Sequence, residues 1–345
     1  MSAAKSEDHA AELDVLTQAR TWLREGRKVA LATVVDTWGS APVAVGGQMA
    51  VAADGRFQGS VSGGCVEGDV IAEAGDAIES GKVRTLAFGV ADETAWRAGL
   101  PCGGQIKVFV EPLDRDTSLP LLDRMLTARE ERTGLVLSTR LEDGAREIFD
   151  AAQAKSEPAV AERLRAGRSA LKEMSDGERF LQVVVPPARV IIIGATHIAQ
   201  ILTELVRLAG YQVVVVDPRT AFASPERFAG TELITEWPQD ALPKLGLDPY
   251  TAVVALAHVG HIDDEALKLA LRSDCFYIGA LGSKRNHAKR TERLLAAGFT
   301  AADIGRIAAP IGIDIGAESP PEIALSVMAQ IVLALRGTKA ARKAA

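Results

Sequence analysis

The chain has 345 residues, with 39 lysines and arginines against 45 aspartates and glutamates, and a formal net charge of -6. This acidic balance argues against general electrostatic attraction to nucleic acid or to an anionic membrane surface. No apolar run reaches the roughly 18 residues of a membrane span, and the polar first residues lack the apolar core of a signal peptide, so we expect a cytoplasmic protein.

The first part of the chain predicts a small α/β domain over residues 1–113. Apolar residues recur at helical spacing before Gly26, and the next segment alternates β-branched with small residues between glycines and prolines, as short strands do. The expected elements are a helix over 12–25, short strands over 28–65, a helix over 66–80, and strands over 83–89 and 105–113. Residues 114–186 show a weaker pattern, with a helix near 118–131 and a strand over 134–141, and we interpret them as a connecting region.

The last part of the chain predicts a Rossmann-like, doubly wound parallel sheet over residues 187–337. The strand RVIIIGA, a helix with one apolar face and the strand YQVVVVD form a βαβ unit, and the later strands TAVVALA and CFYIGAL alternate with helices. Ser319 and Glu322 form a capping signature for a last helix over 320–336. The predicted fold class is therefore α/β throughout, with a flexible tail at 338–345.

The sequence SVSGGCVEGD places Cys65 in a glycine-rich turn directly before a helix. A thiol there would lie among unpaired amides at the positive end of the helix dipole, which lowers its pKa and favours the thiolate. Cys65 is therefore a candidate nucleophile, sulfur carrier or ligand for a soft metal, and the amides at Gly63 and Gly64 could hold a phosphate. The alternative is a small residue in a structural turn, and Glu67 beside the thiol opposes its ionisation.

A second cysteine, Cys102, is flanked by Gly103 and Gly104 in the sequence GLPCGGQ, just before a strand. A structural turn before a strand uses the same residues, but two such cysteines in one small domain favour a function. Three cysteines without a C-x-x-C pair predict neither a disulfide framework nor a zinc site. Cys275 begins an apolar strand and is expected to be packed rather than reactive.

The turn of the βαβ unit is a candidate dinucleotide site. Gly194 begins the turn, Thr196 and His197 follow, and Asp217 ends the next strand at the spacing of a ribose-binding acid. Thr196 stands where a second glycine normally lets the backbone approach a pyrophosphate, which disfavours tight NAD binding. Arg219 could favour a 2′-phosphate, and the alternative is a sheet that retains the architecture without this ligand.

A third candidate site lies at the carboxyl ends of the later strands, where open α/β sheets bind ligands. Gly282 is followed by Ser283, Lys284 and Arg285 at the expected start of a helix, a pattern that favours an anionic ligand. His258 belongs to an H-x-x-H pair that could bind a metal, but no third ligand is evident. We therefore favour an anion pocket.

The chain resembles the XdhC/CoxI family, accessory proteins of xanthine dehydrogenase, carbon monoxide dehydrogenase and related molybdenum hydroxylases. The resemblance runs in order from about residue 28 to 336, apart from the middle connector. It rests on the segments SGGCVEGDV, GLPCGGQIKVFVEPL, VIIIGATHIAQ, VVVVDPR, YIGALGSKR and RIAAPIGIDIGAESPPEIA.

This resemblance implies an N-terminal domain that binds the molybdenum pterin cofactor and a C-terminal Rossmann domain. The cofactor would be protected while a cysteine desulfurase supplies sulfur for its terminal sulfido ligand, and would then be inserted into a molybdenum hydroxylase by a homodimeric protein. By motif, Cys65 inherits the main role in cofactor or metal contact and sulfur handling, and Cys102 the secondary role. The surrounding candidate residues are Gly63, Gly64, Glu67, Gly103 and Gly104.

A maturation factor is thus the leading hypothesis, ahead of a catalytic enzyme. The alternative is an NAD(P)-dependent oxidoreductase, which Asp217 supports but Thr196 and the lack of an evident acid–base pair oppose. A scaffold that only bridges the desulfurase and the target enzyme is a third possibility.

Overall fold

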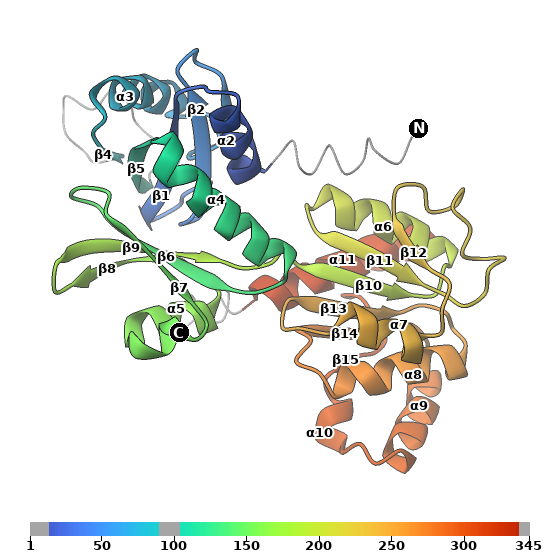
Figure 1. Cartoon of the computed structure of the whole chain (residues 1–345). Coiled ribbons are helices and arrows are strands. Elements are labelled where there is room, and N and C mark those ends of the chain that lie inside the picture. The colour runs from blue at the N-terminus through green and yellow to red at the C-terminus, as the bar shows by residue number, and fades with distance from the viewer. Residues whose placement is uncertain (1–13, 90–103, 338–345) are drawn as a thin grey trace. The chain divides into compact units, whose positions relative to one another are not determined.

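The computed structural model describes residues 14–89 and 104–337, which form two compact units (Figure 1). The chain passes from one unit to the other between Pro186 and Pro187. We call the described residues up to Pro186 the first unit and those from Pro187 the second unit. None of the described helices is both long enough and apolar enough to span a bilayer.

The first unit is built on a five-stranded antiparallel sheet in the order β3-β2-β1-β5-β4. Its elements are α2 (Val15–Arg24), β1 (Val29–Trp38), β2 (Gln48–Ala52), β3 (Phe57–Gly59), α3 (Glu67–Ser80), β4 (Arg84–Phe88), β5 (Gln105–Leu113) and α4 (Arg115–Glu130). Side chains alternate along β1, so that Leu31 packs with α2 and α4 while Ala30 and Ala32 pack with α3. Both faces of the sheet are covered, which explains the nearly continuous apolar pattern of β1.

Residues 114–186, which we interpreted as a connector, are an integral part of the first unit. After α4 they form a second antiparallel sheet in the order β7-β6-β9-β8. Its elements are β6 (Leu135–Arg140), β7 (Arg146–Asp150), the 3-10 helix η2 (Gln153–Ser156), α5 (Pro158–Ala166), β8 (Ala170–Met174) and β9 (Gly177–Val184). Leu135 and Val184 share an apolar core with α2 and β1. Arg146 of β7 also pairs at 2.8 Å with the buried Glu111 of β5, which ties the two sheets together.

The second unit is a six-stranded parallel sheet in the order β12-β11-β10-β13-β14-β15. Its elements are β10 (Arg189–Ile193), α6 (His197–Leu208), β11 (Gln212–Val216), β12 (Glu232–Ile234), α7 (Pro238–Leu245), β13 (Thr251–Ala255), α8 (Gly260–Leu271), β14 (Tyr277–Ala280), α9 (Lys284–Ala296), α10 (Ala301–Ile304), β15 (Ile307–Ala308) and α11 (Pro320–Arg336). The chain runs outwards from β10 to β12 and then returns to the other side of β10 with β13. The topological switch point therefore lies between β10 and β13. This parallel α/β sheet confirms the predicted fold class.

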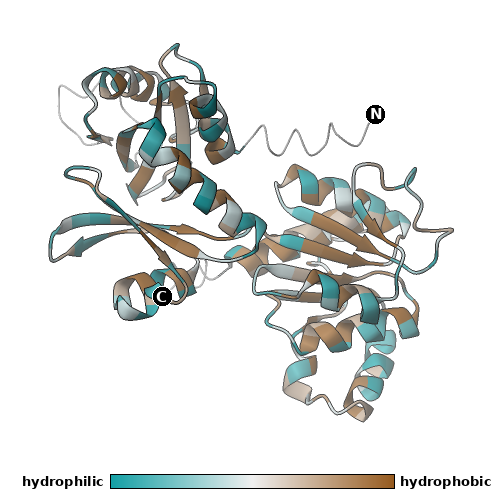
Figure 2. Ribbon diagram, in the orientation of Figure 1, coloured by the Kyte–Doolittle hydropathy of each residue, from teal (hydrophilic) through white to brown (hydrophobic). Residues whose placement is uncertain are grey.

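Helices cover both faces of the parallel sheet. Ile192 of β10 packs with α6 and α11, whereas its neighbour Ile191 packs with α7 and α8. Figure 2 shows the result, with apolar strands inside and polar colour on the outer faces of the helices. Helix α11 begins with the predicted capping box between Ser319 and Glu322.

Candidate functional site

Cys65 lies in the loop between β3 and α3. The two preceding residues, Gly63 and Gly64, have φ angles of +76° and +110°, which residues with side chains rarely adopt, so the turn depends on glycine. Cys65 is exposed, while Val66 after it is buried against α3. The loop therefore presents the thiol to solvent at the start of a helix.

The Glu67 carboxylate holds this loop in place from inside. Glu67 is the first residue of α3, and only 9% of it is exposed. Its Oε1 accepts hydrogen bonds from the Ser60 hydroxyl and from the amides of Ser62, at 2.9 Å, and Val61, at 3.2 Å. Its Oε2 accepts hydrogen bonds from the Ser62 hydroxyl and from the Gly64 amide, at 2.8 Å. One carboxylate thus satisfies most of the polar groups of the turn.

The loop amides are therefore paired, contrary to our prediction that they would be free. Besides the Gly64 amide, the Gly63 amide donates to the Ser60 hydroxyl at 2.8 Å, and the Cys65 amide donates to the Ser62 hydroxyl at 2.9 Å. A phosphate could bind these amides only by displacing their present acceptors. The chemistry that the loop offers to a ligand is thus the thiol of Cys65.

We predicted that Glu67 contacts the cofactor, but its carboxylate is buried beneath the loop and is bound to the loop itself. Burial opposes its ionisation, but hydrogen bonds from Ser60 and Ser62 outweigh burial and lower the pKa of Glu67 to about 2. The carboxylate is therefore charged at neutral pH and acts as a positioning group for Cys65.

The loop between β1 and β2, residues 39–47, touches both cysteine motifs. A Cβ atom on Gly104 would lie 2.1 Å from the carbonyl oxygen of Ser40, so only glycine fits at the start of β5. A Cβ atom on Gly63 would lie 3.4 Å from the Cβ of Pro42. The Cys65 loop and the residue that precedes β5 are therefore gathered around one short loop of the first unit.

The rest of the second cysteine motif, Cys102 and Gly103, lies outside the described residues. Within residues 14–89 and 104–337, no cluster of three or more His, Cys, Asp or Glu side chains could hold a metal ion.

The turn after β10 joins a parallel strand to a helix, as in a Rossmann fold, and its first residue packs closely against the segment that follows β13. Gly194 has a φ angle of +103°, and a Cβ atom there would lie 2.4 Å from the backbone of Ala257, just after β13. The two segments therefore touch at the switch point. Thr196 caps α6 by accepting a hydrogen bond from the Ala199 amide at 3.3 Å, and His197 is exposed.

Both oxygens of Asp217 are engaged inside the protein. Oδ2 accepts hydrogen bonds from the Ala195 amide and from Nη2 of Arg219, both at 2.7 Å, and Oδ1 accepts from the amide and Nε of Arg219, both at 2.9 Å. Burial would raise the pKa of Asp217, but these hydrogen bonds outweigh burial and lower it. The carboxylate predicted to bind a ribose instead locks the turn to the end of β11. Arg219, predicted to meet a 2′-phosphate, is bound to that carboxylate and lies over the ring of Phe222.

Because Asp217 is occupied in this way, we expect no saturable binding of NADH or NADPH at micromolar concentrations. Titration of the protein with either nucleotide, followed by nucleotide fluorescence, should match titration into buffer. A saturable increase in fluorescence would mean that the Asp217–Arg219 pair opens for the ribose, and would favour the oxidoreductase alternative.

The residues predicted for an anion pocket after β14 lie at the start of α9. Gly282 has a φ angle of +134°, and Ser283 caps the helix by accepting a hydrogen bond from the Asn286 amide at 3.3 Å. Lys284 and Arg285 are exposed in the first turn. None of these four residues lines the pocket that opens beside the same helix.

A pocket of about 170 Å³ instead opens beside the next turns of α9. It is lined by Lys289, Arg290 and Arg293, and by His258, which is exposed with a φ angle of +57°. Sequence reasoning missed the three basic residues of α9, although positions three and four apart share one helix face. His258 was the one predicted residue that the structure brings to this pocket.

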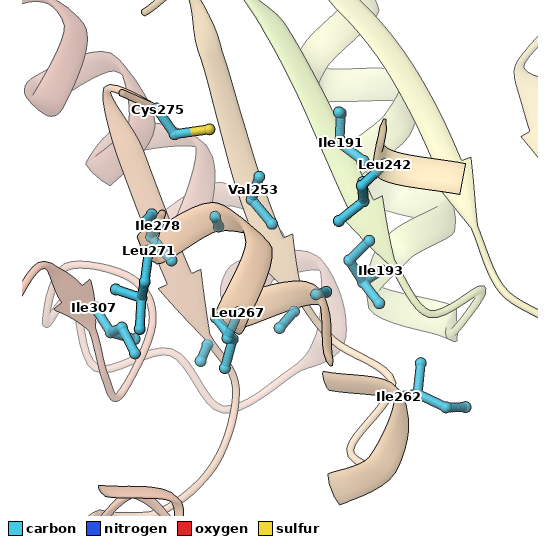
Figure 3. Close-up of a cluster of buried hydrophobic side chains, with 14 of the residues drawn as sticks. Ile191, Ile193, Leu242, Val253, Ile262, Leu267, Leu271, Cys275, Ile278 and Ile307 are labelled. Atoms are coloured by element: carbon cyan, nitrogen blue, oxygen red, sulfur yellow. The ribbon is translucent and has the colours of Figure 1, made fainter. Parts of the chain in front are cut away.

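Cys275 lies in the apolar core, as its position in the sequence predicted. It is 6% exposed and belongs to an apolar cluster of the second unit, at the edge of the part drawn in Figure 3. Burial raises the pKa of its thiol. Among the described cysteines, only Cys65 therefore offers a thiol to a ligand.

Comparisons with known proteins match both units. The family model of the XdhC and CoxI family matches residues 22–89, and that of the XdhC Rossmann domain matches residues 190–331. The molybdenum cofactor insertion chaperone PaoD of Escherichia coli is 31% identical over 94% of this chain and 88% of its own length. A protein of Bacillus subtilis named as a probable subunit of xanthine dehydrogenase is 28% identical over 90% of this chain and 94% of its own.

A solved structure agrees with these matches. The crystal structure of a protein described as a xanthine dehydrogenase from Bacillus halodurans superposes with a TM-score of 0.73 at 27% identity, covering 94% of this chain and 96% of the other. Relatives in sequence and in structure thus span nearly the whole chain, and the motifs around Cys65 and Gly194 fall within the matched regions. The chain belongs to the XdhC and CoxI family.

Proposed function

We propose that this chain binds the molybdenum cofactor and takes part in its insertion into a molybdenum hydroxylase. Relatives named as a molybdenum cofactor insertion chaperone and as a probable subunit of xanthine dehydrogenase support a role in maturation. The observation on this chain that carries the proposal is the exposed Cys65, presented by a loop that the buried Glu67 organises.

The Cys65 thiol would make the contact with the metal of this cargo. A thiolate is a soft metal ligand. Because Glu67 and Ser62 fix the backbone around it, the thiol is positioned before the cargo arrives, which reduces the entropy lost on binding.

We further propose that the cofactor is protected while it receives its sulfido ligand, that a cysteine desulfurase supplies the sulfur, and that the chain acts in the cytoplasm as a homodimer. Cys102 would serve as the second thiol.

Removing the Cys65 thiol should abolish retention of the cofactor. The purified protein is incubated with freshly released molybdenum cofactor, excess is removed by gel filtration, and molybdenum and pterin are quantified. We expect about one cofactor per chain for the wild type and at least a tenfold loss in Cys65→Ala, since a metal–thiolate contact exceeds the ~1.4 kcal/mol that a factor of ten represents.

Two further variants make this test specific. Cys65→Ser keeps the size of the side chain but replaces the soft ligand, so it should lose the cofactor as Cys65→Ala does. Cys275→Ala removes a buried thiol and should retain the cofactor. Equal retention in all four proteins would refute the assignment of Cys65, and a mass increase of one sulfur atom on Cys65 after treatment with a desulfurase would identify it as a sulfur carrier.

A further inference from the structure

The wall of the pocket beside α9 contains a buried guanidinium group, that of Arg290, whose hydrogen-bonding capacity is only partly used. Only 6% of Arg290 is exposed. Its Nη2 donates to the carbonyl oxygen of Leu281 at 3.1 Å, but Nε and Nη1 have no hydrogen-bond partner among the described residues. Nε lies 3.8 Å from the Asp264 carboxylate, which is beyond hydrogen-bond distance. Buried charge of this kind is costly unless a partner compensates it.

The groups around Arg290 also favour an anion. Helix α8 begins at Gly260, which lines the pocket, and its N-cap residue Val259 makes no side-chain cap. The positive end of this helix dipole therefore lies at the pocket. A Cβ atom on Gly260 would lie 3.6 Å from Nη2 of Arg293, which places that guanidinium at the same opening. Lys289 adds an exposed ammonium group.

The carboxylates of this region compensate these cations only in part. Asp264 pairs with Arg293, from Nη2 to Oδ1 at 3.1 Å. Asp263 is 1% exposed and accepts a hydrogen bond from the Ala257 amide at 3.1 Å, and burial raises its pKa to about 6 although Arg290 opposes the rise. The charged side chains at the pocket are Lys289, Arg290 and Arg293 against Asp263 and Asp264.

We propose that this pocket binds a phosphoryl group, with Arg290 and Lys289 as its main contacts. Guanidinium and ammonium groups beside an uncapped helix N-terminus form a set of donors suited to phosphate oxygens. The volume of about 170 Å³ accommodates a phosphoryl group with a few attached atoms, whereas sites for drug-sized ligands measure roughly 300–1,000 Å³. The proposal is independent of the proposed function, because it involves neither Cys65 nor the first unit.

Calorimetric titration of the full-length protein with inorganic phosphate at constant ionic strength tests this site. The wild type should show saturable binding. Arg290→Met should weaken it about tenfold or more, as expected for losing a charged hydrogen-bond donor, and Lys289→Ala about threefold, because that group is exposed. Lys244→Ala is the matched control, since Lys244 is exposed on α7, pairs with Glu236 and does not line the pocket.

The proposal is overturned if the wild type does not bind phosphate, or if Lys244→Ala weakens binding as much as Lys289→Ala. Asp263→Asn provides an independent measurement should Arg290→Met fail to fold. It removes a negative charge from the pocket while keeping a side-chain oxygen for the Ala257 amide, so phosphate should bind several-fold more tightly at pH 7.5. Unchanged or weaker binding would contradict the assignment.

The source of the phosphoryl group is resolved by comparing ligands that share it. Inorganic phosphate, AMP and a pterin phosphate are titrated separately and in competition with each other. Tighter binding of AMP would identify a nucleotide ligand, tighter binding of the pterin phosphate would identify the phosphate end of a pterin, and equal affinities would identify phosphate itself. Failure of AMP and of the pterin phosphate to compete with inorganic phosphate at the pocket would exclude both larger ligands.

Discussion

Replacing Glu67 by alanine should destabilise the first unit by about 4 kcal/mol, because it leaves several buried donors without an acceptor at about 1–3 kcal/mol each. The affected donors are the hydroxyls of Ser60 and Ser62 and the loop amides that the carboxylate accepts. Urea unfolding can be followed by tryptophan fluorescence in a Trp237→Phe background, since the other three tryptophans precede Pro186. Glu73→Ala is the control. Glu73 lies on the same helix as Glu67 and pairs with Arg84 of β4 at the surface, so its substitution should cost under ~1 kcal/mol.

The same carboxylate should make the first unit sensitive to acid. The pKa of Glu67 is lowered from 4.5 to about 2 in the folded protein, so its ionisation stabilises the fold above pH 4.5, and this stabilisation is lost as the pH falls towards 2. The shift corresponds to about 3 kcal/mol. Glu67→Gln should abolish this part of the pH dependence, and Glu73→Gln should leave it. If Glu67→Gln and the wild type lose stability in parallel between pH 5 and pH 2, the carboxylate does not hold the loop as described.

Replacing Gly194 by alanine should destabilise the second unit by about 4 kcal/mol or more. A left-handed conformation costs a non-glycine residue about 1–3 kcal/mol, and the added Cβ would also lie 2.4 Å from the Ala257 backbone, which forces β10 and β13 apart. Hydrogen exchange of peptides from β10 and β13 would report the loss locally.

Gly210→Ala separates the two causes. Gly210 has a φ angle of +74°, but a Cβ atom there would meet no heavy atom within 4 Å, so its substitution adds strain without a clash. It should cost about 1 kcal/mol. Equal losses of stability in Gly194→Ala and Gly210→Ala would show that the backbone at Ala257 moves away from the added Cβ atom at little cost.

The sequence was sufficient to predict the second unit because its signals are local. An apolar strand, a capped helix and another apolar strand recur with short turns, and helix α11 begins and ends where the pattern predicted, from Pro320 to Arg336. In the second sheet of the first unit only β6 carried such a signal, as the strand predicted over 134–141. Strand β8 has the sequence ALKEM, and its pairing is determined by β9, to which it is hydrogen-bonded along its whole length.

The sequence was sufficient to place the candidate residues in turns and at strand ends, but not to predict their hydrogen-bond partners. A sequence does not show which acceptor a given donor binds in the folded protein. Asp217 stands where a ribose-binding acid would, yet the arginine two residues later occupies it. Glu67 follows an amide-rich turn that could serve a ligand, yet the carboxylate fills that role itself. Arg290 lies in a strongly charged helix that predicts solvent exposure, yet it is buried in the folded unit, where it contacts Leu281.

The ion pair between Arg146 and Glu111 limits where the chain can be truncated to give a folded fragment of the first unit. A fragment that ends near residue 113 would leave the Glu111 carboxylate buried in β5 without its cation, and would uncover the apolar side of β1 that α4 and β6 shield. Such a fragment would expose a sheet face prone to aggregation. The smallest piece of the first half suited to separate expression therefore extends to Pro186, and a family boundary drawn on the cysteine motifs alone would not yield a folded domain.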